Sequence, residues 1–334
     1  MQKLRKLATD QGYQSYMVER YYLMYGVEKT FELISEFMNP PVPSIRVNTN
    51  NISAFNLKQQ LEQKGYKLEE VPWCDSGFFI YQKSKFQDIS KATEFNRSPG
   101  ASHEYLQGYY SLQSSSSMIP PLMLDPPPGE EVLDMSAAPG SKFVQMAQMM
   151  ENRGLLVGID RSAKRVQALK ANVYRCSVKN SVLISNDSRN LEKEYFQGFD
   201  KILLDAPCTG EGLIGSDPAR KSSRSVGDIE TLMNIQVQLL SKAVELIRPG
   251  GRIVYSTCSL APEENENVIT SVLSDRDDFK IKNPPPSFTE LFDPGFTDAF
   301  DVDFIDGLQN AIRVLPLHHP TRPEGFFAVI LEKI

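Results

Sequence analysis

A predicted strand gives way to a predicted helix within residues 131–142, which read EVLDMSAAPGSK. The apolar residues before Asp134 are typical of a buried strand, and the small residues after it form a turn where the backbone can approach a ligand closely. Apolar runs alternate with amphipathic helices from here to the C-terminus, which predicts an α/β fold with a mostly parallel, doubly wound, Rossmann-like sheet. The predicted strands are 131–135, 155–160, 181–186, 199–205, 252–257 and 325–331, and the predicted helices are 162–176 and 228–247.

Upstream of this sheet the pattern divides into two further regions. Apolar residues at helical spacing fill residues 1–40 and stop at Pro40 and Pro41, which predicts a helical lead-in. Residues 41–105 then suggest a small α+β domain, and residues 106–334 form the predicted catalytic domain. The small domain has predicted strands at 44–48, 67–71 and 78–81 and a helix at 53–64.

The composition excludes several classes of protein. No apolar run approaches the roughly 20 residues of a membrane span, and the N-terminus leads into no apolar signal core, so we expect a cytoplasmic protein. The four cysteines form no CxxC pair and have no histidine at ligand spacing, which argues against a metal site and a disulfide framework. We also expect a monomer.

The charge distribution restricts how a nucleic acid could bind. The net charge is −6, and since residues 1–120 carry +1, residues 121–334 carry −7. A polyanion would therefore have to be held by local basic patches. The candidates are Lys3/Arg5/Lys6, Lys83/Lys85/Lys91/Arg97 and Arg220/Lys221/Arg224.

Polar residues at the predicted strand ends indicate a cofactor site, because ligands of open parallel sheets bind at the carboxyl ends of the strands. The turn after residue 135 lacks both phosphate-binding glycine patterns, and a carboxylate beside Lys142 fits it better. Asp160, framed by Arg165, suits a ribose diol, and Asp187 can accept from an adenine amino group. A carboxylate-bearing adenosine without phosphate is S-adenosyl-L-methionine. The predicted cofactor residues are Ser136, Ala137, Ala138, Pro139, Gly140, Ser141, Lys142, Asp160, Arg165, Asp187 and Asp205.

Two cysteines follow the next two predicted strands, in polar turns that are poor candidates for core packing. Cys208 lies three residues after Asp205, and Cys258 follows Thr257. A thiolate that adds to carbon 6 of a pyrimidine makes carbon 5 nucleophilic enough to take a methyl group. An acid such as Asp205 would stabilise the charge that is pushed into the ring. The pattern therefore predicts methylation of pyrimidine carbon 5.

These residues resemble the NSUN (Sun-type) RNA cytosine-5 methyltransferases, whose fold is a class I methyltransferase sheet. The resemblance rests on motifs that occur in the family's order: Arg46-Val47-Asn48-Thr49, Ala137-Ala138-Pro139-Gly140, Asp205-Ala206-Pro207-Cys208, Thr257-Cys258-Ser259 and Glu263-Glu264-Asn265-Glu266. It implies that Cys258 is the nucleophile, that Cys208 assists product release, and that Asp205 contacts the base, with Lys142 in the catalytic set. DNA cytosine methyltransferases attack with the cysteine of a Pro-Cys motif, so Cys258 points to RNA.

The resemblance also describes the N-terminal part and leaves the substrate open. Residues 41–105 are similar to the family's small RNA-recognition-motif-like domain, and the implied substrate is tRNA or rRNA. Arg220, Lys221 and Arg224 are predicted to touch phosphates beside the target cytosine. Ser136 stands where the family usually has Cys. Two alternatives remain: an amino-group methyltransferase, which needs no thiol, and a non-catalytic RNA-binding assembly protein with the same fold.

Overall fold

The computed structural model describes residues 2–82 and 99–334, and it divides into two compact units. Unit 1 comprises Met1–Pro41, Glu192–Gly198 and Leu204–Ile334, and unit 2 comprises Val42–Leu191 and Phe199–Leu203. The basic patch predicted at Lys83, Lys85, Lys91 and Arg97 lies outside the described residues. Each unit is described below by itself.

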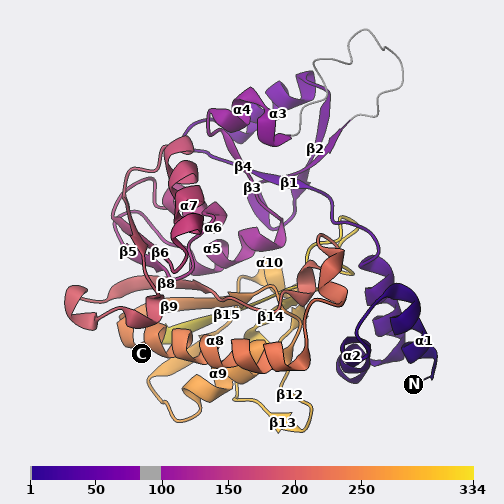
Figure 1. Cartoon of the computed structure of the whole chain (residues 1–334). Helices are drawn as coiled ribbons and strands as arrows, with labels where there is room; N and C mark the ends of the chain where they lie inside the picture. Colours follow the sequence, from indigo (N-terminus) through magenta and orange to yellow (C-terminus); the bar gives the residue numbers. More distant parts are fainter. Residues whose placement is uncertain (1, 83–98) are drawn as a thin grey trace. The chain divides into compact units, whose positions relative to one another are not determined.

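Unit 2 begins with a small antiparallel sheet in the order β2-β3-β1-β4. Its elements are β1 (Ser44–Val47), α3 (Ala54–Gln63), β2 (Tyr66–Val71), β3 (Cys74–Gln82), η2 (Pro99–Ala101), α4 (His103–Leu106) and β4 (Tyr110–Leu112). Alternate strand residues such as Ile45 and Val47 form a core with Leu57 and Leu61 of α3. The helix lies along the sheet in Figure 1. The predicted α+β character of this region is confirmed, and β4 is a strand that the sequence pattern did not predict.

The other face of this sheet is also covered, by the second half of unit 2. Arg46, which is completely buried, donates to the side chains of Gln113 and Gln148. Asn48 donates to the carbonyl of Cys176 at 2.9 Å, and the Trp73 indole donates to the carbonyl of Ser115 at 2.9 Å. These buried polar contacts fix the small sheet to the parallel strands, because an unmade hydrogen bond would leave a buried polar group unsatisfied.

The second half of unit 2 contains four parallel strands in the order β8-β5-β6-β7. Short helices precede them, and α6 and α7 connect β5 to β6 and β6 to β7. The elements are η3 (Ser116–Met118), α5 (Ile119–Leu124), β5 (Glu131–Asp134), α6 (Ser141–Met149), β6 (Leu155–Asp160), α7 (Ala163–Arg175), β7 (Ser181–Ser185), η4 (Ser188–Asn190) and β8 (Phe199–Asp205). The predicted parallel strands are confirmed to within two residues at each end. β8 passes from unit 2 into unit 1 at Leu204.

Unit 1 contains β9, which is paired antiparallel with β15, and further strands on β15. Helices α8 and α9 pack on each other, and Figure 1 shows them beside β9 and β15. The elements are η5 (Lys193–Tyr195), η6 (Glu211–Leu213), η7 (Pro218–Lys221), α8 (Val226–Leu246), β9 (Ile247–Thr257), η8 (Pro262–Glu264), α9 (Glu266–Leu273), β10 (Phe279–Lys282), α10 (Pro286–Thr289), β11 (Asp293–Pro294), β12 (Asp298–Ala299), β13 (Val302–Asp303), η9 (Leu308–Asn310), β14 (Ile312–Val314) and β15 (Phe326–Lys333).

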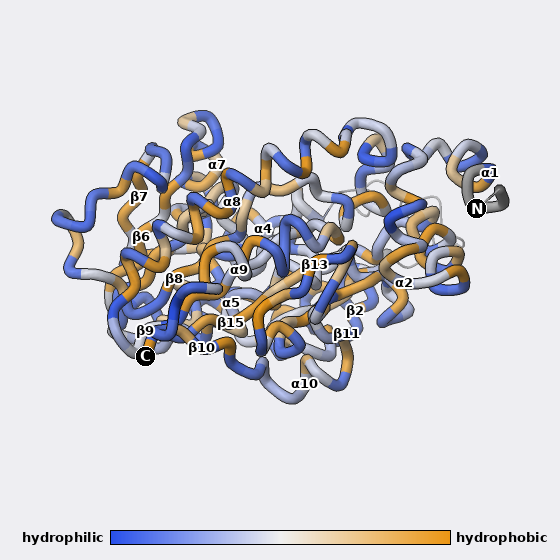
Figure 2. The backbone as a smooth tube through the Cα atoms, turned by 90° about the horizontal axis from the view of Figure 1, so that it is seen from below, coloured by the Kyte–Doolittle hydropathy of each residue, from blue (hydrophilic) through white to orange (hydrophobic). Residues whose placement is uncertain are grey.

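Two predicted boundaries in unit 1 can be compared with the structure. The apolar run predicted as a strand at 325–331 is β15, which is hydrophobic and buried from Phe326 to Leu331 (Figure 2). β9 begins at Ile247, five residues before its predicted start, so residues 247–251 also belong to the strand. Gly250 has a φ of 74°, which a glycine adopts readily, and the pairing with β15 begins at Arg252.

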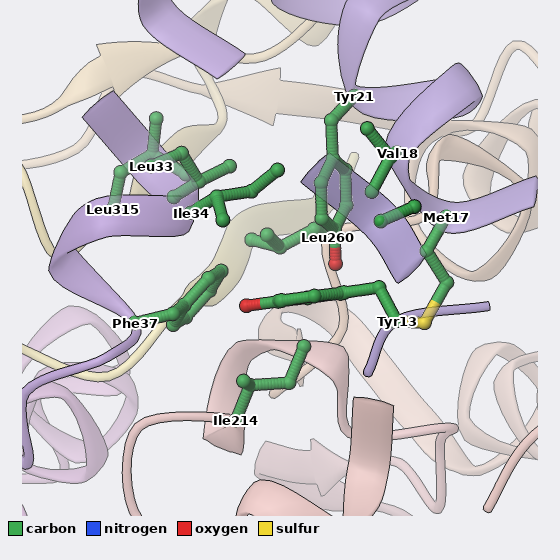
Figure 3. Close-up of a cluster of buried hydrophobic side chains, with 11 residues drawn as sticks. Tyr13, Met17, Val18, Tyr21, Leu33, Ile34, Phe37, Ile214, Leu260 and Leu315 are labelled. Atoms are coloured by element: carbon green, nitrogen blue, oxygen red, sulfur yellow. The ribbon is translucent and has the colours of Figure 1, made fainter. Parts of the chain in front are cut away.

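The N-terminal helices belong to unit 1 and pack against residues of that unit that come much later in the sequence. They are α1 (Gln2–Gln11) and α2 (Ser15–Glu36), and α2 is broken at Gly26, whose φ is 77°. Figure 3 shows Tyr13, Tyr21 and Phe37 packed around Leu260, with other residues of one buried cluster. The cluster comprises Ala8, Tyr13, Met17, Val18, Tyr21, Leu33, Ile34, Phe37, Ile214, Leu260 and Leu315. The helical lead-in is therefore part of the core that supports residues 208–260.

Candidate functional site

Two loops of unit 1 carry the predicted catalytic thiols. The first loop follows β8 and contains Cys208, and the second follows β9 and contains Cys258. The loops begin side by side, since the amide of Ala206 donates to the carbonyl of Ser256 at 2.8 Å. The amide of Gly212 donates to the carbonyl of Cys258 at 2.9 Å, which joins the loops again beyond the thiols.

The sulfur atoms of Cys208 and Cys258 are 3.2 Å apart, within hydrogen-bond distance for thiols. Both residues are partly exposed, whereas Cys74 and Cys176 are buried. The hydrogen bond to Cys258 raises the pKa of Cys208 well above its ordinary value, and burial raises it further. Either sulfur can be the donor of this hydrogen bond, and the raised pKa means that Cys208 holds its proton more tightly than an ordinary thiol does.

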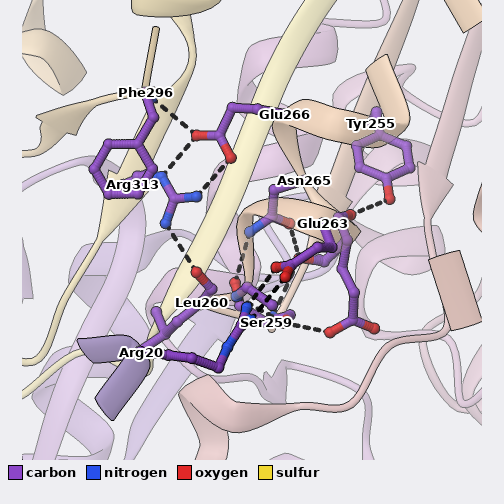
Figure 4. Close-up of polar contacts among 12 residues, drawn as sticks. Arg20, Tyr255, Ser259, Leu260, Glu263, Asn265, Glu266, Phe296 and Arg313 are labelled. Atoms are coloured by element: carbon purple, nitrogen blue, oxygen red, sulfur yellow. Dashed lines mark hydrogen bonds and ion pairs between the residues drawn. The ribbon is translucent and has the colours of Figure 1, made fainter. Parts of the chain in front are cut away.

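The turn that carries Cys258 is fixed by buried polar groups on both sides of it. The Thr257 hydroxyl bonds the Asn265 side chain at 2.5 Å, and Asn265 in turn donates to the carbonyl of Ser259 at 3.0 Å. Arg313 donates to the carbonyl of Leu260 at 3.1 Å, and the Tyr255 hydroxyl donates to the main chain of residue 264 at 2.5 Å. Figure 4 shows Asn265 beside Ser259, with Arg313 and Tyr255 on either side of them. A turn held in this way loses little entropy when its thiol reacts.

Asp205 closes β8 beside the thiol loops. Its carboxylate accepts a hydrogen bond from the Ser256 hydroxyl at 2.8 Å, and Ser256 lies two residues before Cys258. The structure thus brings together the predicted acid and both predicted thiols at the ends of β8 and β9. The roles assigned to them from the sequence stay predictions.

Unit 2 carries the predicted cofactor loop at the carboxyl ends of its own strands. The Ser136 amide bonds the carboxylate of Asp134 at 3.2 Å, and the Ala137 amide bonds the carbonyl of Ile159 at 2.9 Å. Gly140 has a φ of 112°, and a Cβ there would lie 2.8 Å from a methyl carbon of Leu169. Because a larger residue would be strained and would clash, Gly140 is required for α6 to start at Ser141.

The predicted ribose residue lies next to this loop. Asp160 ends β6 and is 3% exposed, which is unusual for a carboxylate unless it has partners. One of its oxygens accepts from the Ser162 amide at 2.9 Å, and the other lies 3.2 Å from Arg165. Arg165 also donates to the carbonyl of Ala138. Arg165 therefore links the end of β6 to the loop, as its predicted framing role requires.

The remaining two predicted cofactor residues already have partners within unit 2. Asp187 accepts from both ends of the Arg189 guanidinium, at 3.0 and 2.7 Å, and these bonds lower the pKa of Asp187. Lys142 donates to the Ser117 hydroxyl at 2.7 Å. The sequence pattern did not indicate either of these partners, Ser117 and Arg189.

The three predicted RNA-contacting cations lie in and after η7, in unit 1. Arg220 donates to the carbonyl of Thr209 at 2.8 Å and pairs with Asp217 at 3.1 Å, so it supports the Cys208 loop. The Lys221 ammonium lies 4.9 Å from the centre of the Tyr13 ring, and burial lowers its pKa. Arg224 is half-buried. Contact of these residues with RNA stays a prediction.

Two polar residues near the thiols were missed as functional candidates. Gln236 of α8 is completely buried and donates to the carbonyl of Pro207 at 2.8 Å. Glu264 is completely buried and accepts from the residues that follow each thiol. The acidic run at 263–266 directly after the Cys258 turn was a signal that could have drawn attention to Glu264.

Two kinds of feature are absent from residues 2–82 and 99–334. No helix there is long and apolar enough to cross a membrane. Within the same ranges, no group of three or more histidine, cysteine or acidic side chains is arranged to hold a metal ion.

Comparison with known proteins places these features in a family. Residues 121–332 match the family described as "16S rRNA methyltransferase RsmB/F", and residues 16–115 match the "N-terminal domain of 16S rRNA methyltransferase RsmF". A methyltransferase homologue of known crystal structure from Pyrococcus horikoshii is 34% identical, with a TM-score of 0.85 and 99% of each chain covered.

Curated relatives agree with this assignment over part of their length. "Ribosomal RNA small subunit methyltransferase F" of Shewanella loihica is 41% identical over 71% of this chain and 48% of the relative. "25S rRNA (cytosine-C(5))-methyltransferase nop2" of Schizosaccharomyces pombe is 35% identical over 84% of this chain and 45% of the relative. The chain thus spans about half the length of these relatives. On the family match over residues 121–332, the chain belongs to the 16S rRNA methyltransferase RsmB/F family.

Proposed function

We propose that this protein is an S-adenosyl-L-methionine-dependent RNA (cytosine-5)-methyltransferase that acts on ribosomal RNA. The observation that carries the proposal is the pair of thiols 3.2 Å apart, next to a carboxylate at the ends of β8 and β9. An amino-group methyltransferase has no use for two thiols, and a non-catalytic protein has no need to keep them partly exposed. Relatives whose printed names specify rRNA favour ribosomal RNA over tRNA.

The residues of unit 2 fit the methyl donor by their chemistry. The loop from Ser136 to Ser141 offers small residues and the amides at the start of α6, which suit a carboxylate. Asp160 provides a buried carboxylate for a ribose diol, and Asp187 an acceptor for an adenine amino group. Lys142 adds a positive charge beside the loop. When bound, the donor supplies an electrophilic methyl group.

The thiol pair accounts for the attack on the base. The Cys258 thiolate adds to carbon 6 of the cytosine, forming a carbon–sulfur bond and pushing an electron pair toward ring nitrogen 3. Asp205, as the acid beside that nitrogen, would donate a proton to the ring and take it back when the double bond between carbons 5 and 6 is restored. Carbon 5 is then nucleophilic enough to accept the methyl group.

The same pair accounts for product release. The largest cause of the raised pKa of Cys208 is its hydrogen bond to Cys258. Once Cys258 is bonded to carbon 6, its sulfur carries no charge and accepts hydrogen bonds poorly, so the pKa of Cys208 falls. Cys208, as thiolate, can then take the proton from carbon 5, and the electron pair left behind expels the Cys258 thiolate. Formation of the adduct therefore favours the thiolate form of Cys208, which is the group that breaks the adduct down.

Three further parts of the proposal concern partners. We propose that Lys221 and Arg224 contact RNA phosphates, whereas Arg220 acts mainly by supporting the Cys208 loop. RNA contacts from residues 41–105 would use strand edges and loops, because both faces of that sheet are covered. We also propose a monomer that works in the cytoplasm.

Methyl transfer to defined RNA tests the proposed function. The protein is incubated with radiolabelled S-adenosyl-L-methionine and either deproteinised ribosomal RNA or tRNA, and bisulfite sequencing locates the product. We expect 5-methylcytosine in ribosomal RNA, none with Cys258→Ala, and full activity with Cys74→Ala, which changes a buried cysteine of unit 2. Methylation of tRNA alone would refute the substrate, and methylation by Cys258→Ala would refute the mechanism.

A further inference from the structure

Glu264 is a buried carboxylate that the reaction described above does not use. It lies at the end of η8, is completely buried and has both oxygens occupied. One oxygen accepts from the Thr209 amide at 2.9 Å and from Gln236 at 3.1 Å. The other accepts from the hydroxyls of Thr209 and Ser259, the latter at 2.5 Å. Satisfying a buried carboxylate so fully indicates a specific role for its position.

The donors to Glu264 come from the two thiol loops. Thr209 directly follows Cys208, and Ser259 directly follows Cys258, so one side chain binds the neighbour of each thiol. The two hydroxyls also lie 3.2 Å from each other. Glu264 thus links the residues that directly follow the two cysteines.

Glu264 is itself held on the scaffold of unit 1. Its carbonyl accepts from the Tyr255 hydroxyl of β9 at 2.5 Å. Gln236 of α8, completely buried, donates both to Glu264 and to the carbonyl of Pro207, which precedes Cys208. The carboxylate is thus connected to a strand and a helix, which are stiffer supports than a loop.

The influences on the pKa of Glu264 are consistent with a carboxylate that stays in place as a hydrogen-bond acceptor. Burial raises its pKa, and the hydrogen bonds from Ser259, Thr209 and Gln236 oppose that rise. Removing the carboxylate would leave the Thr209 amide without its acceptor in the interior and would take one of two acceptors from the Gln236 amide group. The two loops would then separate or rearrange to recover hydrogen bonds.

We propose that Glu264 is a positioning residue that sets the distance between the sulfur atoms of Cys208 and Cys258. The effect of Glu264 on methyl transfer rests on the proposed function, whereas its effect on the distance between the two sulfur atoms does not. The test therefore uses a reagent that needs neither RNA nor the methyl donor. Phenylarsine oxide binds two nearby thiols: two arsenic–sulfur bonds form, both thiols lose their protons, and the oxide oxygen leaves as water.

Affinity for phenylarsine oxide is measured on the full chain by titration, with Cys74→Ala/Cys176→Ala as the background so that only the two loop thiols remain. We expect Glu264→Ala to bind the arsenical at least tenfold more weakly. Glu264→Asp keeps the charge but is one methylene shorter, and we expect at least a threefold loss. Alkylation of the separate thiols by a monofunctional reagent should be retained in both variants, because each thiol remains present and partly exposed.

The matched control is Glu263→Ala, which removes the neighbouring carboxylate, a partner of Arg20, and should leave the arsenical affinity unchanged. Circular dichroism establishes that each variant is folded, and if Glu264→Ala does not fold, Glu264→Asp decides. Wild-type arsenical affinity in a folded Glu264 variant would overturn the proposal. In methyl transfer, Glu264→Asp should lower kcat and leave KM for RNA unchanged. If the wild-type protein methylates no RNA, the proposed function fails while the arsenical result still decides the role of Glu264.

Discussion

Replacing Glu211 by glutamine should remove a pH dependence from the stability of this protein. Glu211 begins η6, three residues after Cys208, and is 2% exposed. Neither of its carboxylate oxygens has a hydrogen-bond partner among the described residues. Burial raises its pKa to about 7; Arg20 lowers this pKa, and Glu264 and Glu263 raise it.

The sign and the size of the effect follow from this shift. In the unfolded chain the pKa of Glu211 is near 4.5, its ordinary value. Between pH 4.5 and about 7 the folded state therefore binds one proton more than the unfolded chain. The contribution of Glu211 protonation to the free energy of unfolding is therefore complete below pH 4.5 and is lost as the pH rises through about 7. At about 1.4 kcal/mol per pK unit, the loss amounts to about 3 kcal/mol.

Urea unfolding of the wild type and Glu211→Gln at several pH values between 5 and 8 measures this difference. The free energy of unfolding of the wild type should fall relative to the variant by about 1.4 kcal/mol per pH unit up to pH 7 and then level off. Glu230→Gln, an exposed change on α8, serves as the control. Parallel pH profiles for the wild type and Glu211→Gln would refute the reasoning.

Three other predictions concern the donor, the RNA and the scaffold. Asp160→Ala should weaken S-adenosyl-L-methionine binding by about 1.5–3 kcal/mol, which is more than tenfold in the Kd measured by calorimetry. An unchanged Kd would contradict the prediction that Asp160 binds the ribose. Charge reversal of Lys221 and Arg224 should weaken RNA binding without changing donor affinity, and the wild-type log–log salt slope should be about −2 to −4; a slope near −8 would place the RNA elsewhere. Arg313→Met leaves Glu266 buried without its ion-pair partner, so unfolding free energy should fall by about 3–5 kcal/mol and partly recover in Arg313→Met/Glu266→Gln; a purely additive double variant would contradict this.

Much of the fold could be predicted because the spacing of apolar residues and the positions where strands end are local properties of the sequence. The apolar run before Asp134 and the small residues after it predict a strand and a turn without reference to any distant residue. The juxtaposition of Cys208 and Cys258 was also predictable, since both follow strands that end at the same edge of a sheet. Those inferences needed only the order of the elements.

The missed features depend on contacts between residues distant in the sequence. Nothing in the pattern of residues 1–40 indicates that Tyr21 and Phe37 pack around Leu260. Glu264 was part of a recognised motif, but its hydrogen bonds to two loops exist only in the folded chain. Arg220 was predicted to touch RNA from its charge and its place shortly after the catalytic strand, whereas its hydrogen bond to Thr209 depends on how η7 folds back.

The central claim is that Cys258 attacks the base and Cys208 releases it. The most direct measurement is denaturing gel electrophoresis of Cys258→Ala and Cys208→Ala after incubation with ribosomal RNA and S-adenosyl-L-methionine. Cys208→Ala should accumulate a protein–RNA band that resists denaturation, because the adduct forms but its carbon-5 proton is not removed. Cys258→Ala should give no such band. A resistant band with Cys258→Ala and none with Cys208→Ala would contradict the assignment of the two thiols.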